Sequence, residues 1–471
     1  MFKVLIRPLQ IEDAKISWVW RNDPEVWKLT GNRPDKTITF DVEHEWLKNV
    51  LSDDSTKRFA ITVDDLYVGN VQLTSLNAVN AEFHIFIGEK QFWSKGVAKE
   101  ATYQILHYAK QILKLQEVYL YVKKANIGAV NVYKKNSFVI ESEDSTDCKM
   151  ICELDQLRTP EVSIFCMVYN HANFLKDALE GFLMQKSSFS TVIVIGEYCS
   201  TDNSREVIEI YAKMYPGKFI LLYHDLNIGA HKNQEMILKN CVGKYVAMCE
   251  GDDYWVDPLK LQKQVDFLEA NGDFSICFHN TGIVYEKGIE PFLENINSST
   301  AEVTNIFDLL KGNYIHTASV VFRNNSDYPT WLGNAYPGDW PLHIINSTYG
   351  KIKFMKDVMA YYRVHYGGVH STTGGQPEKT LHTYKNLCEE LELRGLIKES
   401  RFACKLYNNW FAAFYGLKDG ELRKYNRFGK SIILLRQGSI KLKFLFWLPL
   451  LFNNTSNKVY GVILNIYSKF K

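Results

Sequence analysis

The spacing of hydrophobic positions differs between the first third of the chain and the part that follows it. In the first part, short apolar runs and helix-like patterns follow each other in no fixed order, which predicts mixed α and β structure. Two of these runs flank Asp64-Asp65, a combination typical of a β-hairpin, and the polar run 141–147 is expected to be a loop. The expected strands are 4–6, 59–63, 68–73, 81–87, 118–122 and 149–154, with helices over 11–20 and 97–113.

After Pro160, apolar strands alternate with amphipathic helices, a pattern typical of a largely parallel α/β sheet. The expected strands are 162–168, 192–195, 219–223 and 245–249, and the helices between them are expected up to residue 183 and over 203–214 and 233–240. Beyond residue 375 the pattern is helical. The sequence therefore predicts an α/β protein of three parts, 1–157, 160–375 and 376–471.

The charge balance argues against a nucleic-acid-binding protein. The 55 Lys and Arg residues face 53 Asp and Glu residues, so the net charge is only +2 and leaves no excess to neutralise phosphates. The charge is unevenly distributed, because the 50 residues after Glu421 contain ten Lys or Arg and no Asp or Glu. We expect such a tail to contact an anionic surface.

The cysteines and the apolar runs indicate a cytoplasmic protein. Nine cysteines lack the density and spacing of a disulfide scaffold, the N-terminus does not have the pattern of a signal peptide, and no run reaches the roughly 20 apolar residues that cross a bilayer. In the tail, lysines precede the nine apolar residues 444–452. This segment is expected either to lie at the inner face of the cytoplasmic membrane, as a peripheral contact, or to pack as a buried helix.

One candidate anion site lies in the first part of the chain. The segment 91–101 leaves an expected strand and opens an expected helix, so that consecutive backbone N–H groups can face an anion. Small residues at Ser94, Gly96 and Ala98 let a pyrophosphate approach the backbone. An ordinary turn has the same pattern, and the later segment 122–138 is what makes the combination specific.

With these two segments, residues 1–155 resemble a GNAT acetyltransferase of the kind that acetylates amino sugars or protein N-termini. The resemblance implies acetyl-CoA as cofactor and Tyr133 as the acid that protonates the departing thiolate, since a phenol with a pKa of about 10 stays protonated at neutral pH. The alternative for Tyr133 is a core-edge aromatic residue. Glu82 or His84 is the expected base for the amine. The residues implied to bind acetyl-CoA are Trp93, Ser94, Lys95, Gly96, Val97, Ala98 and Asn126.

A second candidate site follows the expected strand 245–249. Asp252 and Asp253 stand at the carboxyl end of this strand, which is where open α/β sheets bind ligands. Adjacent carboxylates repel each other unless a divalent cation lies between them and a diphosphate. A solvated turn is the alternative for such a pair, and the order of the surrounding motifs decides against it.

These ordered motifs, over residues 160–375, resemble the inverting GT-A glycosyltransferases. The resemblance implies a nucleotide-diphospho-sugar donor, a divalent Mn or Mg ion and a carboxylate base, for which Asp339 is expected; the alternative for Asp339 is the N-cap of a helix that starts near Leu342. The residues implied to bind the donor are Tyr169, Glu197, Asp202, Asp252 and Arg363, and those implied to bind the metal are Asp253 and His365.

The resemblance leaves the nucleobase open. Tyr198 stands where the family usually has the aspartate that contacts uracil. Three explanations remain: Glu197 or Asp202 takes that role, the base is not uracil, or the domain is weakened.

Together the two domains predict a bifunctional enzyme of surface polysaccharide or glycoconjugate biosynthesis. The first domain is expected to N-acetylate an amino sugar, and the second to transfer a sugar to a saccharide, lipid-linked or protein acceptor. In one rival hypothesis, favoured by the departures from the family patterns at Trp93, Ser137 and Tyr198, one domain is a non-catalytic binding module. In the other, the acetyl acceptor is a protein amine.

Overall fold

The computed structural model describes residues 2–28, 36–287, 300–368 and 377–414. The chain divides into two compact units, residues 1–383 and 384–471. The first unit contains both β-sheets. Within the described ranges, no helix combines the length and the apolar character that a membrane span requires. The apolar run 444–452, on which the expected membrane contact depends, lies outside the described residues.

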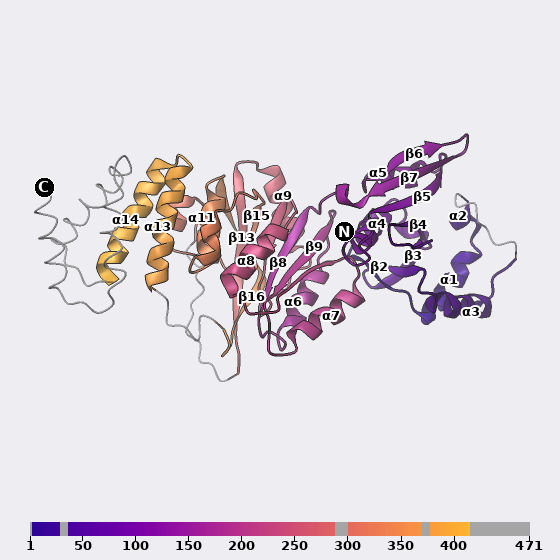
Figure 1. Cartoon of the computed structure of the whole chain (residues 1–471), viewed down its shortest axis with the longest axis horizontal. Coiled ribbons are helices and arrows are strands. Elements are labelled where there is room, and N and C mark those ends of the chain that lie inside the picture. Colours follow the sequence, from indigo (N-terminus) through magenta and orange to yellow (C-terminus); the bar gives the residue numbers. More distant parts are fainter. Residues whose placement is uncertain (1, 29–35, 288–299, 369–376, 415–471) are drawn as a thin grey trace, which may run out of the picture. The chain divides into compact units, whose positions relative to one another are not determined.

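The first sheet has seven strands in the order β1-β2-β3-β4-β5-β7-β6 (Figure 1). The predicted hairpin is confirmed, because β2 and β3 pair antiparallel and both Asp64 and Asp65 have the positive φ of a tight turn, 48° and 69°. The strands are β1 (Val4–Pro8), β2 (Lys57–Val63), β3 (Leu66–Thr74), β4 (Asn80–Ile87), β5 (Glu117–Lys123), β6 (Val139–Glu143) and β7 (Asp147–Glu153).

Helices pack on both faces of this sheet. Because side chains alternate along a strand, Phe59 and Ile61 of β2 join one apolar cluster with α4, while Ala60 joins another with α1 and α3. These helices are α1 (Ala14–Arg21), α3 (Phe40–Leu51) and α4 (Val97–Gln111). Two shorter helices also belong to this part of the chain: α2 (Pro24–Trp27), between α1 and α3, and α5 (Ile127–Lys134), after β5.

The parallel pairing between β4 and β5 is short. Only three residue pairs join the two strands, and the last of them is Glu82 with Tyr119. β4 continues to Ile87 and stays paired with β3 on its other side. From Phe83 onward, β4 has no partner strand on its β5 side within the described residues, so the backbone groups of Phe83 and Ile85 can pair with an extended ligand.

The expected loop at 141–147 is partly wrong, because β6 occupies residues 139–143 and pairs antiparallel with β7. This strand is the last in the sheet order, and all five of its residues are exposed. An exposed edge strand needs no apolar face, so its polar sequence carried no strand signal.

The second sheet has the order β10-β9-β8-β11-β15-β13-β16-β12, with β14 paired to β16. The expected parallel arrangement is confirmed for β10, β9, β8 and β11, whereas β15 joins this set antiparallel. The strands are β8 (Val162–Val168), β9 (Thr191–Glu197), β10 (Phe219–Tyr223), β11 (Tyr245–Met248), β12 (Tyr254–Trp255), β13 (Phe274–Tyr285), β14 (Val303–Thr304), β15 (Val321–Arg323) and β16 (Lys351–Val364).

The helices that accompany the second sheet follow the predicted alternation. Apolar residues of α6 and α9 pack with β8, β9 and β11 in one buried cluster. The helices are α6 (Leu175–Leu183), α7 (Ser204–Met214), α8 (Ala230–Asn240), α9 (Lys260–Ala270), α10 (Ile306–Lys311) and α11 (Asp339–Ser347). The helical character expected for residues 376–471 is confirmed up to residue 414 by α13 (Pro377–Leu393) and α14 (Ile397–Phe414), and the remainder lies outside the described residues.

Candidate active sites

The turn before α4 has the geometry of an anion cradle. Ser94 and Gly96 adopt left-handed backbone angles, with φ of 59° and 84°. Trp93 fixes the turn against β4, because its indole N–H donates to the carbonyl of Ile87 at 2.8 Å. The first N–H groups of a helix have no acceptor within it, so those that begin at Val97 are available to a pyrophosphate.

Tyr133 on α5 lies beside Phe83, the first residue of β4 beyond the paired segment. The two rings meet edge to face with centroids 5.7 Å apart, and Tyr133 is 8% exposed. Burial raises the pKa of the Tyr133 phenol to about 12, so the hydroxyl is protonated at neutral pH. The packing agrees with the core-edge alternative and the protonation agrees with the role of an acid, so substitution must separate the two.

Asn126 is the N-cap of α5. Its side-chain oxygen accepts the Ala129 backbone N–H at 3.2 Å, which leaves the amide NH₂ group for a cofactor. Only a binding role was expected for Asn126, and the structure adds this capping role.

Glu82 and His84, the two candidate bases, lie on the same face of β4. The Nε2 atom of His84 is 2.9 Å from the Thr74 hydroxyl and 3.5 Å from a carboxylate oxygen of Glu82. Burial lowers the pKa of His84, so its imidazole is neutral at physiological pH and can accept a proton. His84 lies beyond the last pair that joins β4 to β5, beside the gap between these strands.

Three carboxylates meet after β11. Glu250, Asp252 and Asp253 each offer an oxygen atom, and these atoms lie within 4.8 Å of one another. Within the described part of the chain, one oxygen each of Asp252 and Asp253 is buried without a hydrogen-bond partner. Burial and the neighbouring acids raise the pKa of Asp253, and they raise that of Glu250 to about 8. Such a set of repelling oxygens fits a divalent cation.

His365 lies beside the acidic cluster. Its Nε2 atom is 3.1 Å from a carboxylate oxygen of Asp252, and its expected role as a metal ligand together with Asp253 stays a prediction. Asp253 is 1% exposed and accepts the backbone N–H of Arg363 at 2.9 Å, which connects it to β16. The carboxylate beside His365 is therefore Asp252.

The sequence reasoning missed His171, whose Nε2 atom is 3.6 Å from the same oxygen of Asp252. Burial opposes ionisation of Asp252, but the two imidazoles outweigh it and lower the pKa of this carboxyl. His171 could have been found from its place two residues after Tyr169, at the carboxyl end of a strand.

Arg363, a residue of β16, connects this strand to α6 through its side chain. Its guanidinium stacks on Phe174 and Tyr254, at 4.7 and 5.0 Å from the ring centroids, and donates to Asp177 at 2.8 Å. Its Nε atom is buried without a hydrogen-bond partner among the described residues, so one donor remains for a ligand.

Asp339 is the first residue of α11, and the N-cap position belongs to Gly338, so the capping alternative is wrong. One carboxylate oxygen accepts the Trp340 backbone N–H at 2.8 Å, and the other accepts from the Asn313 amide at 2.9 Å. The charge of Asp339 contributes to the raised pKa of Glu250. Asp339 is therefore held in one orientation close to the acidic cluster.

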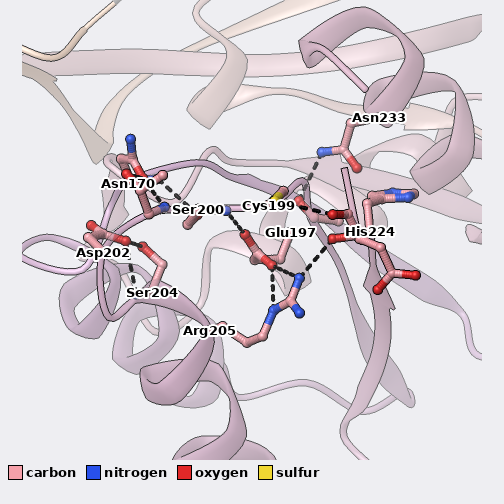
Figure 2. A network of polar contacts seen from close by, with 12 residues as sticks. Asn170, Glu197, Cys199, Ser200, Asp202, Ser204, Arg205, His224 and Asn233 are labelled. Atoms are coloured by element: carbon pink, nitrogen blue, oxygen red, sulfur yellow. Dashed lines mark hydrogen bonds and ion pairs between the residues drawn. The ribbon is translucent and has the colours of Figure 1, made fainter. Parts of the chain in front are cut away.

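Figure 2 shows the turn after β9, where Glu197 is fully buried. One carboxylate oxygen of Glu197 binds two nitrogens of Arg205, at 2.5 and 2.7 Å, and the other accepts the Ser200 backbone N–H. Arg205 also donates to the carbonyl of His224 at 3.0 Å. Both oxygens of Glu197 therefore hold the turn, and its expected contact with the donor stays a prediction.

Asp202 also uses both of its carboxylate oxygens to accept hydrogen bonds from the protein. One oxygen accepts the Ser204 backbone N–H at 3.0 Å, and the other accepts the Ala172 N–H at 2.9 Å (Figure 2). Both oxygens thus hold backbone groups of the turn and of its neighbour, and the expected contact of Asp202 with the donor stays a prediction.

Tyr169 and Tyr198 form the aromatic surface of this turn. Their rings stack with centroids 4.8 Å apart and an interplanar angle of 16°. Burial raises the pKa of Tyr198 well above its ordinary value, so the phenol stays a neutral hydrogen-bonding group.

Two family models match the chain. The acetyltransferase (GNAT) domain model covers residues 3–139, and the glycosyl transferase family 2 model covers residues 163–327. The first match contains the α4 turn and Tyr133, and the second contains the acidic cluster and the Tyr169–Tyr198 pair.

Curated relatives include proteins named for each activity. An uncharacterized protein of Mycobacterium tuberculosis is 37% identical over 208 residues, which are 44% of this chain and 60% of that protein. The spermidine N(1)-acetyltransferase of Escherichia coli is 30% identical over 142 residues, 30% of this chain and 75% of that enzyme. The putative teichuronic acid biosynthesis glycosyltransferase TuaG of Bacillus subtilis is 25% identical over 242 residues, with coverages of 48% and 88%. The chain thus spans less than two thirds of the first of these relatives.

Proposed function

Because the chain belongs to the GNAT acetyltransferases through its first domain and carries a family 2 glycosyl transferase domain after it, we propose that it is a bifunctional enzyme of surface polysaccharide or glycoconjugate biosynthesis. The first domain N-acetylates an amino sugar with acetyl-CoA. The second transfers a sugar from a nucleotide-diphospho-sugar, with a divalent cation, to a saccharide, lipid-linked or protein acceptor. The printed name of TuaG, which refers to teichuronic acid, supports a polysaccharide pathway.

In the proposed acetyl transfer, acetyl-CoA lies between β4 and β5 with its pyrophosphate at the start of α4. The amine attacks the thioester carbonyl, the C–S bond breaks, and Tyr133 gives its proton to the departing thiolate. His84, or Glu82 beside it, takes the proton that the amine loses. The free backbone groups of β4 hold the cofactor arm in an extended conformation.

In the proposed sugar transfer, Asp339 takes the proton of the acceptor hydroxyl, whose oxygen attacks the anomeric carbon. The bond to the diphosphate then breaks on the opposite side, which inverts the configuration. Asp252 and its neighbours Glu250 and Asp253 would hold the divalent cation, whose positive charge stabilises the leaving diphosphate. The Tyr169–Tyr198 surface receives the nucleobase.

The proposed sugar transfer rests on one observation: three carboxylates meet at the carboxyl end of β11. Two of them have an oxygen atom that is buried without a hydrogen-bond partner among the described residues. The test is a mass-spectrometric screen of the purified full chain. It is given acetyl-CoA with nucleotide-linked amino sugars, and donor hydrolysis with Mn²⁺ is measured separately. N-acetylated product and hydrolysed donor both support the proposal. Binding of acetyl-CoA without turnover of any amino sugar favours a binding module or a protein amine as acceptor.

We place the enzyme in the cytoplasm with its tail at the inner face of the cytoplasmic membrane. All nine cysteines are free thiols, as a reducing compartment maintains them. The support for membrane contact is the sequence of the tail, with ten Lys or Arg after Glu421 and the apolar run 444–452. Full-length protein should sediment with anionic liposomes and be partly released by salt. If the full-length protein does not sediment with the liposomes and a chain that ends at Gly438 unfolds, the apolar run is part of a buried core and the proposed membrane contact is wrong.

A further inference from the structure

Two arginines of the GNAT domain share one tryptophan ring. The guanidinium carbon of Arg21 on α1 lies 4.9 Å from the ring centroid of Trp46 on α3, and that of Arg58 on β2 lies 5.4 Å from it. Arg21 also lies over Trp27, at 5.4 Å. The aromatic rings therefore fix two flat cations close together on the α1 and α3 side of the sheet.

The positive charge of this pair is only partly neutralised. Glu43 is buried and lies 3.3 Å from the Nε atom of Arg21, but Arg58 has no ion-pair partner within the described part of the chain. The Nε atom of Arg58 is buried without a hydrogen-bond partner among the described residues, whereas its Nη1 atom donates to the amide oxygen of Gln72. Burial lowers the pKa of Arg58; the negative charge of Asp53 opposes this shift, and the positive charge of Arg21 adds to it. Holding like charges together costs free energy, which a bound anion would recover.

The arginine pair lies on the same sheet face as the candidate bases. Arg58 is paired in register with Gln72 of β3, and Gln72 with His84 of β4, so the three side chains form one row across the sheet. Two strand spacings separate Arg58 from His84, which is about 10 Å. The side chain of Arg21 is 24% exposed, so a ligand can reach it from solvent.

We propose that Arg21 and Arg58 form a phosphate subsite for the acetyl acceptor, so that the first domain acts on a phosphorylated or nucleotide-linked amino sugar. The inference rests on the proposed acetylation of an amino sugar. The sugar ring spans the row from His84, where the amine is acetylated, to the arginines, where its phosphate binds. A guanidinium binds phosphate oxygens with two parallel hydrogen bonds, and stacking on Trp46 presents it in a fixed plane.

The same subsite excludes a polyamine as acceptor. Spermidine carries several positive charges and would meet the two guanidiniums with like charge, whereas Glu43, the carboxylate beside them, is buried and already paired with Arg21. The name of the E. coli relative, spermidine N(1)-acetyltransferase, therefore does not extend to the acceptor of this chain.

The test compares matched acceptors that differ only in the phosphate. The full chain, in EDTA to remove divalent cations from the second domain, is given acetyl-CoA with UDP-linked 2-amino and 4-amino hexoses, the corresponding free hexosamines, or spermidine. Arg58→Met keeps a long side chain on Trp46 and should raise KM for the UDP-linked sugar about 10-fold or more. The values of kcat and of KM for acetyl-CoA should change little, and Arg58→Lys should recover part of the loss. KM for the free hexosamine should stay unchanged.

Lys48→Met is the matched control. Lys48 lies on α3 two residues from Trp46, and residues two apart on a helix do not share a face. Its side chain is 63% exposed and pairs with Glu45, so KM should not change. Equal losses for the UDP-linked and the free sugar in Arg58→Met, or faster turnover of spermidine than of the UDP-linked sugar, overturn the phosphate subsite.

Calorimetry separates this inference from the proposed function. If the UDP-linked sugar is acetylated but Arg58→Met changes nothing, the subsite is wrong and the proposed acetylation stands. If the native chain binds the UDP-linked sugar in EDTA without acetylating it, and Arg58→Met weakens that binding, the subsite stands and the proposed acetylation is wrong. If the chain neither binds nor acetylates the sugar, both are wrong.

Discussion

Tyr169 and Tyr198 stack face to face where the neighbouring parallel strands β8 and β9 end, with ring centroids 4.8 Å apart. The carboxylates nearest in sequence, Glu197 and Asp202, bind Arg205 and backbone N–H groups instead of facing a ligand. We therefore expect the donor base to be recognised by stacking rather than by a carboxylate.

A first prediction concerns the selectivity for the base. Without a carboxylate to accept the imide N–H of uracil, the full chain with Mn²⁺ should bind UDP and CDP with similar affinity. Tyr198→Asp should increase the preference for UDP about 10-fold, since a hydrogen bond to a charged group contributes about 1.5–3 kcal/mol. Titration calorimetry measures both, with Tyr198→Phe as the control that keeps the stacked ring. A native chain that already discriminates strongly between UDP and CDP contradicts this prediction.

A second prediction separates donor binding from base catalysis in the second domain. Asp252→Asn and Asp253→Ala should abolish Mn²⁺-dependent binding of UDP, because the diphosphate loses its bridging cation. Asp339→Asn should leave binding intact and lower the transfer rate about 100-fold or more. Equal loss of UDP binding in all three variants would show that this division of roles is wrong.

A third prediction concerns the acid of the first domain. Tyr133→Phe should keep the affinity for acetyl-CoA and lower kcat about 100-fold, as the loss of a general acid does. Because burial raises the pKa of Tyr133 to about 12 and the protonated form is the active one, kcat of the native chain should show no alkaline limb through pH 10, the ordinary pKa of a phenol. Release of free CoA measures both. Tyr108→Phe, in the core of the same domain, should behave like the native chain.

A fourth prediction concerns the turn in Figure 2. Arg205→Met leaves the fully buried carboxylate of Glu197 without its cation, which should destabilise this domain by about 3–5 kcal/mol. Hydrogen exchange at the Ser200 and Thr201 amides should become faster, and UDP binding should be lost at a lower urea concentration. Lys213→Met, at an exposed position of the same helix, should have neither effect. Unchanged exchange in Arg205→Met would mean that the ion pair does not hold the turn.

Much of the secondary structure followed from hydrophobic spacing. The parallel strands β8, β9, β10 and β11 were predicted within about two residues. For β8, β9 and β11 the reason is that a strand buried on both faces is a continuous apolar run. Helix α3 was not predicted: six of its twelve residues are apolar, but of these six only Leu47 is buried. Most of edge strand β6 was expected to be a loop. All its residues are exposed, so its sequence lacks the apolar alternation that indicates a half-buried strand.

For the candidate sites, some residues were predicted from the sequence and others were missed. The α4 turn and the acidic residues after β11 were found because their ligand-binding groups are contiguous in sequence. The partners of Asp252 were not fully identified, since His171 and His365 are brought to it by the ends of β8 and β16. The structural roles of Glu197 and Asp202 were also missed, because a sequence shows a carboxylate without showing which donors occupy its oxygens.

The sequence by itself therefore determined the two domains, their order and the chemistry of their motifs, since these depend on local periodicity and on residues adjacent in the chain. Tertiary structure decided which side chains remain free to act. Glu197 is paired with Arg205, Asp252 rather than Asp253 is placed beside His365, and Arg21 and Arg58 meet on Trp46. Each of these outcomes depends on the register of distant strands and on burial, because burial makes an unpaired charge costly and so fixes its partner.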